Sequence, residues 1–300
     1  MVWLRMFIAD RLIYVELPKT ACTHIGKLLA LVVPGEQRGK HNKPSQAEFD
    51  RRPVFLGSVR NPWAWYVSLW AYGCQQEGML WEALTHGRGS VRGLGWRAAP
   101  IYAGRRWLHS LRQRPAEWQR LYSDVQDVQA FRTWLRWLHE PARRWDSAER
   151  FALHACAERV GLLTYRYLDL FCRGGFRSIA DLESLRAFDA RANYLDLFCR
   201  GSFRSIADLE SLRAFDATAN YLDHVIRTEH LEQDLLMVLE RLQIAVSDEQ
   251  RSQILGGGRS NPSRGKRSRW QDYYDQASIE LVAQRDRFIT ERFGYKSPTL

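Results

Sequence analysis

The sequence predicts an α/β fold built on a central, mostly parallel sheet. Three short apolar runs, at Arg11–Leu17, Pro53–Arg60 and His224–Thr228, are each followed by a stretch with apolar residues at helical spacing. Strands that alternate with helices in this way are typical of parallel sheets. With 300 residues and 45% hydrophobic content, the chain can bury a sizeable core. Composition allows one large or two small domains, and we expect a single domain over 1–300.

The first strand candidate, Arg11–Leu17, is rich in β-branched and aromatic residues and ends at Pro18. From Thr23 onward, apolar residues recur at helical spacing, at Ile25, Leu28, Leu29 and Val32. This pattern predicts a strand, a tight loop and a helix.

The second and third candidates repeat this arrangement. Pro53–Arg60 is followed by Asn61 and Pro62, and a proline at the first turn favours a helix over Trp63–Trp70. His224–Thr228 precedes a helical face made by Leu231, Leu235, Val238 and Leu242. Further helices are expected at about Pro115–Cys172 and at Ser278–Tyr295.

Composition restricts the class of protein. No stretch approaches the roughly 18 consecutive apolar residues of a membrane span, and the N-terminal stretch lacks the cleavage site of a signal peptide. The five cysteines form no CxxC pair, so neither a disulfide framework nor a zinc site is expected. These observations predict a cytoplasmic protein without a membrane span.

The charge points to an anionic ligand. The formal net charge is +10, and 38 of the 44 basic residues are arginine, the side chain suited to bidentate contacts with phosphate and sulfate. An excess of arginine can also reflect the base composition of the gene, and the sequence leaves that alternative open.

A tandem repeat interrupts the α/β pattern. Tyr167–Asn193 recurs as Tyr194–Asn220, with differences only at Gly175/Ser202 and at Arg191/Thr218. Apolar residues at helical spacing predict a turn and a helix in each copy. Two copies are too few for a solenoid, which needs about three or more units. We therefore expect 167–220 to be a duplicated helical segment inserted in the domain.

The bend after the first strand candidate is suited to an anion. A helix that starts at the carboxyl edge of a parallel sheet offers backbone N–H groups and the positive end of its dipole. Lys19 adds a full charge, and Thr20 and Thr23 add hydroxyl donors. No glycine precedes Lys19, so the loop is not that of a nucleoside triphosphatase. No acidic strand end supplies a magnesium ligand, so we expect no metal.

Two stretches resemble the nucleotide motifs of carbohydrate-type sulfotransferases, particularly bacterial members. The first, Leu17–Ile25, reads LPKTACTHI where the 5′-phosphosulfate loop of that family is usually written PKTGGTS. The second, Val59–Tyr72, reads VRNPWAWYVSLWAY and is similar to the family's 3′-phosphate motif, VRNPxxRxxSxY. Three later stretches, starting at Arg227, Asn261 and Arg285, are similar to downstream blocks of the family.

The resemblance implies a P-loop-like three-layer sandwich, the sulfotransferase fold. It also implies transfer of a sulfuryl group from 3′-phosphoadenosine 5′-phosphosulfate (PAPS) to an acceptor hydroxyl, with 3′-phosphoadenosine 5′-phosphate (PAP) as the product nucleotide. The acceptor is expected to be a saccharide or a small hydroxylated molecule. The resemblance covers most of the chain except about Cys74–Ala155 and the repeat.

The resemblance also implies roles for individual residues. Lys19 would contact the bridging oxygen of PAPS, and Arg60 and Ser68 would hold the 3′-phosphate. Arg264 and Lys266 would close over the nucleotide, although such a charged run is also explained as a solvated loop. The 5′-phosphate would be held by the loop and the first helical turn, at Thr20, Ala21, Cys22, Thr23 and His24.

A base must take the proton of the acceptor hydroxyl, and histidine suits this role near neutral pH. His41 is the leading candidate because RGKHNKPS is similar to a stretch at this place in bacterial members of the family. A solvated loop histidine explains it equally well. Glu16 is a second candidate, with a strand carboxylate paired to an arginine as the alternative. Glu229 either helps to organise the site or forms a buried ion pair.

Other functions stay open at this point. A nucleic-acid-binding protein would explain the charge, although the sequence has no recognised motif of that class. A nucleotide-dependent kinase would explain the cation at the bend, although it requires a glycine-rich loop. An inactive sulfotransferase homologue is the third alternative, because Ala21 and Cys22 stand where the family has glycines.

Overall fold

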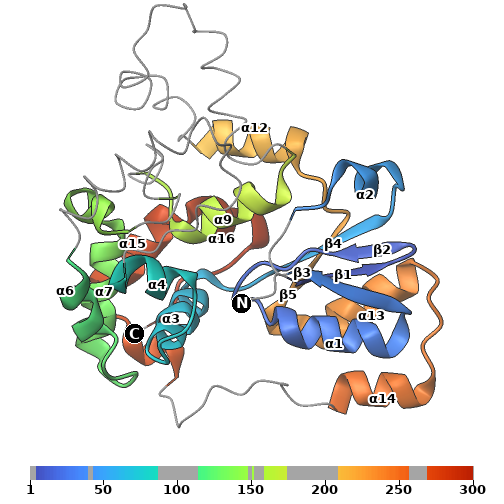
Figure 1. The fold of residues 1–300 in the computed structure, drawn as a ribbon, viewed down its shortest axis with the longest axis horizontal. Helices are drawn as coiled ribbons and strands as arrows, with labels where there is room; N and C mark the ends of the chain where they lie inside the picture. The colour runs from blue at the N-terminus through green and yellow to red at the C-terminus, as the bar shows by residue number, and fades with distance from the viewer. Residues whose placement is uncertain are drawn as a thin grey trace, which may run out of the picture. The chain divides into compact units, whose positions relative to one another are not determined.

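The computed structural model describes residues 5–39, 43–86, 114–147, 151, 159–173, 209–256 and 269–299. The chain divides into two compact units (Figure 1). Unit 1 consists of Met1–Asn61, Arg166–Ile179 and Arg213–Lys266, and unit 2 consists of Pro62–Tyr165, Ala180–Leu212 and Arg267–Leu300. The single domain expected over 1–300 stays a prediction.

Unit 1 contains a five-stranded sheet in the order β3-β1-β2-β4-β5. Strands β2, β4 and β5 are parallel, whereas β1 is antiparallel to both β2 and β3. The α/β fold is confirmed, but the sheet is mixed because a hairpin and an edge strand extend its parallel part. The strands are β1 (Arg5–Ala9), β2 (Leu12–Tyr14), β3 (Gly35–Gly39), β4 (Val54–Val59) and β5 (His224–Arg227).

Helices cover both faces of this sheet. Leu56 of β4 belongs to a buried apolar cluster with residues of α1 and α13, such as Leu29. Its neighbour Phe55 points to the opposite face, where its ring lies 5.0 Å from Phe49 of α2 and 5.2 Å from Tyr221. Figure 1 shows α1 and α13 on one side of the sheet and α2 on the other. The helices that lie wholly within unit 1 are α1 (Cys22–Val32), α2 (Gln46–Asp50), η4 (Thr228–His230), α13 (Leu231–Arg241) and α14 (Asp248–Gly256).

Strands β2, β4 and β5 lie within the three apolar runs that the sequence singled out, so these predictions are confirmed. Strands β1 and β3 were not predicted. β1 carries the unbroken buried run Met6–Ala9, which lacks the alternation of a half-buried strand. β3 reads GEQRG and has no apolar residue, so its conformation depends on pairing with β1, from Arg5 opposite Gly39 to Ala9 opposite Gly35.

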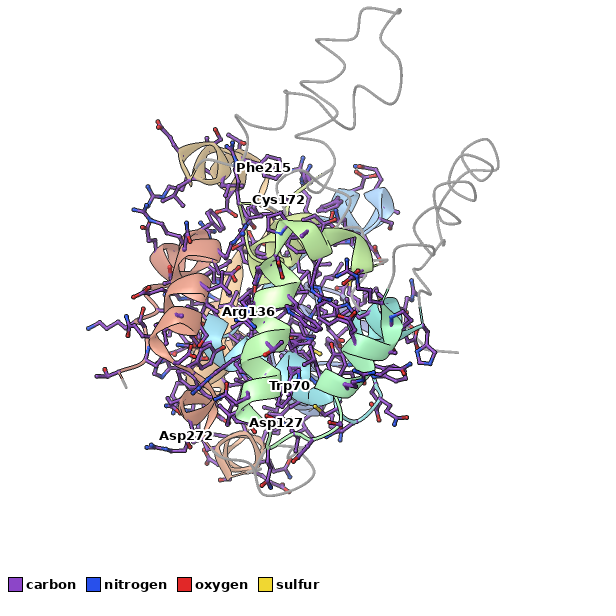
Figure 2. The ribbon with its side chains drawn as sticks, turned by 90° about the vertical axis from the view of Figure 1, so that its left-hand side faces the viewer. Trp70, Asp127, Arg136, Cys172, Phe215 and Asp272 are labelled. Atoms are coloured by element: carbon purple, nitrogen blue, oxygen red, sulfur yellow. The ribbon has the colours of Figure 1, made fainter. Side chains whose placement is uncertain are left out.

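Unit 2 is helical in its described residues, and its core is aromatic. Five tryptophans are at most 1% exposed: Trp63, Trp65, Trp70, Trp118 and Trp134. Figure 2 shows Trp70 among the side chains of this unit. Its helices are α3 (Pro62–Gly73), α4 (Met79–Thr85), α6 (Pro115–Leu121), α7 (Val128–His139), η1 (Pro141–Asp146), η5 (Trp270–Tyr273), α15 (Gln276–Arg285) and α16 (Arg287–Phe293). Among all the helices described, none is long and apolar enough to cross a membrane.

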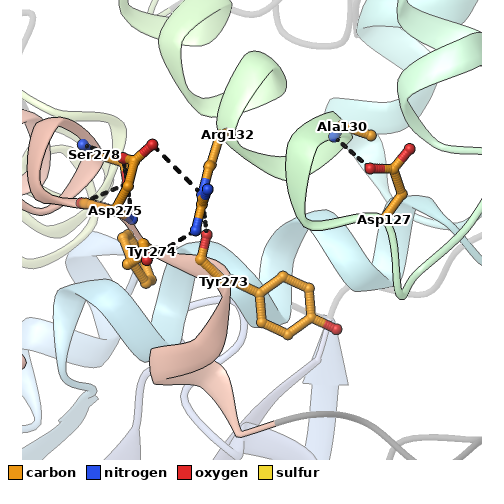
Figure 3. A network of polar contacts seen from close by, with 7 residues as sticks. All are labelled: Asp127, Ala130, Arg132, Tyr273, Tyr274, Asp275 and Ser278. Atoms are coloured by element: carbon orange, nitrogen blue, oxygen red, sulfur yellow. Dashed lines mark hydrogen bonds and ion pairs between the residues drawn. The ribbon is translucent and has the colours of Figure 1, made fainter. Parts of the chain in front are cut away.

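Arg132 links its helix, α7, to η5 and to the residues that follow η5 (Figure 3). Its guanidinium donates to the carbonyl oxygens of Tyr273 and Tyr274, both at 3.0 Å, and forms an ion pair with Asp275 at 3.6 Å. At the start of α7, the Asp127 carboxylate accepts the Ala130 N–H at 2.9 Å, which caps the helix. The start of α7 and its link to η5 are thus fixed by polar contacts.

A buried polar cluster joins four helices of unit 2. The Asp286 carboxylate accepts the Tyr66 hydroxyl at 2.7 Å and both the backbone N–H and the hydroxyl of Thr164, at 2.8 and 2.7 Å. The Tyr66 ring packs edge-on against the buried ring of His139, the last residue of α7, with centroids 5.5 Å apart. The partners come from α3, α7, the start of α9 (Leu162–Phe171) and the cap of α16.

The described parts of the repeat are the first seven residues of copy one and the last twelve of copy two. They meet in unit 1, where Cys172 and Asn220 form an isolated antiparallel bridge. The Arg173 N–H donates to Ala219 O at 2.8 Å, and the Asn220 amide donates to the Tyr167 hydroxyl at 2.9 Å. Copy two ends in α12 (Leu209–Ala219), so a helix is confirmed there. The remainder of the segment lies outside the described residues.

Candidate anion-binding site

The loop predicted to bind an anion joins β2 to α1 at the carboxyl edge of the parallel strands. β2 ends at Tyr14, the pairing with β4 continues through Val15 N–H to Leu56 O at 2.8 Å, and α1 begins at Cys22. Leu17 is the last fully buried residue before the bend, and Lys19 is half-buried. The predicted order of strand, loop and helix is confirmed here.

The loop turns through two residues with left-handed backbone conformations. Lys19 has φ 66°, and Ala21 has φ 60° and ψ 23°. The Ala21 carbonyl accepts the N–H groups of His24 at 2.8 Å and Ile25 at 3.0 Å, which starts α1. Ala21 thus adopts the backbone region for which the resembled motif provides glycine, at a conformational cost that glycine would avoid.

The Thr20 hydroxyl serves the protein itself. It donates to Leu17 O at 2.7 Å, it lies 2.6 Å from the Ser58 hydroxyl oxygen, and its side chain is 0% exposed. Its one hydrogen is therefore already engaged. The hydroxyl contact to phosphate expected of Thr20 is replaced by a contact that shapes the loop. Thr23, at the start of α1, is half-buried, and its contact with an anion stays a prediction.

Arg60 brings the two predicted nucleotide motifs together. It directly follows β4, and its guanidinium donates to the carbonyl oxygen of Lys19 at 3.4 Å. The two residues are 41 positions apart in the sequence. The guanidinium of Arg60 and the backbone of Lys19 therefore lie together at the same edge of the sheet.

The end of β5 completes this edge. The Glu229 carboxylate accepts the N–H of Asn61 at 2.7 Å, and the Thr228 hydroxyl donates to Val59 O at 2.8 Å. Both contacts fix the chain on either side of Arg60. Glu229 is exposed, so the ion pair expected as its alternative would not be buried, and its organising role stays a prediction. Sequence reasoning missed Thr228, although its place directly after a parallel strand was a usable signal.

Besides Thr20, three of the predicted residues near the loop are buried. Glu16 is 1% exposed, His24 is 6% exposed and Cys22 is 8% exposed. Glu16 does not face solvent in the way that a base for an external acceptor requires, and His24 lies in the first turn of α1. Because the side chains of Cys22 and His24 are buried, a ligand at this loop would meet their backbone groups.

The structure does not place the remaining predicted residues at this loop. Ser68 is half-buried on α3 in unit 2, and its convergence with Arg60 stays a prediction. His41, Arg264 and Lys266 lie outside the described residues. Trp63, Trp65 and Trp70 pack in the core of unit 2, so none of them offers a face to adenine.

Comparisons with known proteins complete the description of this site. No family model, no curated protein and no solved structure matches the chain.

Proposed function

We propose that this protein is a PAPS-dependent sulfotransferase, which moves the sulfuryl group to a hydroxyl of a saccharide or another small hydroxylated molecule. The main support is the contact of Arg60 with Lys19, which joins two motifs that the sequence related to one nucleotide. The proposal includes the sulfotransferase fold, which is one specific kind of α/β fold.

The edge of the sheet provides for both phosphates of the nucleotide. The loop N–H groups, Thr23 and the positive end of the α1 dipole would hold the 5′-phosphate. Arg60 would hold the 3′-phosphate as a charged fork, together with Ser68 if the two converge. Arg264 and Lys266 would contribute further cations.

The reaction is an in-line transfer. The acceptor oxygen attacks the sulfur, the bond from sulfur to the bridging oxygen breaks, and PAP leaves with an additional negative charge. Lys19 would stabilise that charge at the bridging oxygen. The proton of the acceptor would pass to a base, with His41 as the leading candidate because Glu16 is buried. No metal has a role in this scheme.

Calorimetric titration with PAP, in buffer with a chelator and with ATP as the control, tests the proposal. We expect saturable binding of PAP and none of ATP. Binding of ATP in a parallel titration, with a divalent metal ion in place of the chelator, would favour a kinase instead. Binding of nucleic acid that weakens steeply with salt, without an effect of PAP, would favour a nucleic-acid-binding protein. Absence of all three would indicate an inactive homologue.

A further inference from the structure

A chain of three buried hydroxyl groups lies beneath the anion loop. Tyr14 of β2, Ser58 of β4 and Thr20 of the loop are each 0% exposed. The Tyr14 and Ser58 hydroxyl oxygens are 2.7 Å apart, those of Ser58 and Thr20 are 2.6 Å apart, and Thr20 reaches Leu17 O at 2.7 Å. The chain thus connects two neighbouring parallel strands to the loop.

Proton counting gives the direction of each hydrogen bond. Leu17 O has no hydrogen, so the single hydroxyl hydrogen of Thr20 is donated to it. Thr20 must then accept from Ser58, and Ser58 must accept from Tyr14. Burial raises the pKa of Tyr14 well above its ordinary value, and the neighbouring Cys22 and Glu16 raise this pKa further. Tyr14 therefore stays protonated and remains the donor at the start of the chain.

The residue at the end of this chain lies between the two strained positions of the loop. Lys19 and Ala21 both have positive φ, and neither is glycine. Such conformations persist only where the surrounding structure holds them. The Thr20 side chain is fixed to Leu17 O, three residues earlier, and to β4. A bend stabilised on two sides keeps its N–H groups in place before a ligand arrives.

We propose that Tyr14 and Ser58 are positioning residues that set the conformation of the Lys19–Ala21 bend through Thr20, and thereby prepare its backbone for a phosphate group. The ligand, PAP, rests on the function proposed above, whereas the effect on the loop does not. Neither residue touches the nucleotide in this scheme.

Hydrogen exchange of the backbone amides of residues 19–24 tests the effect on the loop without any ligand. Tyr14→Phe and Thr20→Val each remove a hydroxyl from the chain, whereas Thr20→Ser keeps it. We expect exchange about tenfold faster with the first two, because local opening becomes easier, and little change with Thr20→Ser. The control is Tyr221→Phe, which removes a buried hydroxyl bond of 2.6 Å to Leu170 O in the same unit.

The affinity for PAP tests the consequence for binding. We expect Tyr14→Phe and Thr20→Val each to weaken PAP about tenfold through lost pre-organisation, while Thr20→Ser and Tyr221→Phe stay close to the parent protein. The double variant Tyr14→Phe with Thr20→Val should lose little more PAP affinity than either single variant, because the three hydrogen-bonded hydroxyl groups act as one unit.

The outcomes separate this proposal from the proposed function. Unchanged exchange in Tyr14→Phe and Thr20→Val, or an equal change in Tyr221→Phe, would overturn the positioning role. A further outcome is faster exchange only in Tyr14→Phe and Thr20→Val, together with a parent protein that does not bind PAP. This pair of results would support the positioning role and contradict the sulfotransferase function. Faster exchange with unchanged PAP affinity would overturn the link from the chain to binding.

Discussion

Ala21 and Lys19 have backbone conformations that residues with a Cβ atom rarely adopt. Ala21, at φ 60°, accepts the first hydrogen bonds of α1, so its conformation is fixed by the start of that helix. The left-handed region costs about 1–2 kcal/mol for a residue with a Cβ atom. Strain of this size often marks a functional loop, because the surrounding structure must compensate for it.

Replacing Ala21 by glycine should therefore raise the free energy of unfolding. We expect a gain of up to about 1 kcal/mol in denaturant unfolding, since the relief of strain exceeds the extra chain entropy of glycine. The matched control is Ala30→Gly, at an exposed position within α1, which should lower the same quantity by about 1 kcal/mol. Equal losses in both variants would contradict the strain at Ala21.

At the scale of elements, polar contacts decide what the apolar pattern leaves open. The apolar runs were sufficient to predict β2, β4, β5 and the start of α1. They were insufficient for β3, which has no apolar residue, and for the Thr20 hydroxyl, because its partner Ser58 is distant in sequence. A single sequence offers no signal for contacts of this kind.

His139 illustrates the energetic role of such buried groups. Its ring is 4% exposed, and neither ring nitrogen has a hydrogen-bond partner among the residues that the structure describes. Burial, and secondarily the charge of Arg285, lowers the pKa of His139 from 6.5 to about 3. The Tyr66 ring and the Arg285 guanidinium, which donates to His139 O at 3.0 Å, are the polar groups next to it.

His139→Leu should consequently change how stability depends on pH. The native state keeps His139 neutral, whereas the unfolded chain takes up a proton below pH 6.5, so acid favours unfolding of the parent protein. The parent should lose up to about 1.4 kcal/mol per pH unit between pH 6.5 and 3 relative to the variant. Burial raises the pKa of Asp286, which acts in the opposite direction, and comparing the two proteins removes this shared contribution.

Urea unfolding at several pH values measures this difference. At pH 7 the variant should be no less stable than the parent, because it buries no unsatisfied nitrogen. Parallel pH dependences for the two proteins would show that the parent does not bury a neutral histidine.

In the whole molecule, the two copies of the repeat contact each other at their outer ends. The start of copy one contacts the end of copy two through Tyr167, Cys172 and Asn220, and the paired residues are the same in both copies. A chain with one copy thus contains every residue that these contacts need. We interpret one 27-residue copy as an insertion that the described contacts do not require.

Deletion of Gly174–Arg200 should therefore preserve the fold of both units. The deleted chain joins Arg173 to Gly201 and keeps one complete copy. The free energy of unfolding should stay within about 2 kcal/mol of the parent value, because the contacts of Tyr167, Cys172 and Asn220 are kept. Denaturant unfolding and circular dichroism measure the result, and a loss of more than about 2 kcal/mol would contradict this interpretation.

The two asparagines at the ends of the copies provide a matched control in the full-length chain. Asn220→Ala removes hydrogen bonds to Tyr167 and Asp216, at 2.9 and 2.6 Å, and should destabilise the protein. The equivalent substitution in copy one, Asn193→Ala, should cost much less. Equal losses of stability in the two variants would show that the two asparagines contribute equally, and would contradict this expectation.

In the proposed function one nucleotide bridges Lys19 and Arg60, and the affinity of Arg60→Ala for two nucleotides tests this bridge. The calorimetric affinity for PAP should fall about tenfold or more, through loss of a charge-assisted bond to the 3′-phosphate. Adenosine 5′-phosphate, which lacks that group, should lose much less. Arg51→Ala is the control, because Arg51 donates to Ala9 O and Asp10 O at the hairpin between β1 and β2. An equal loss for both nucleotides would contradict the account.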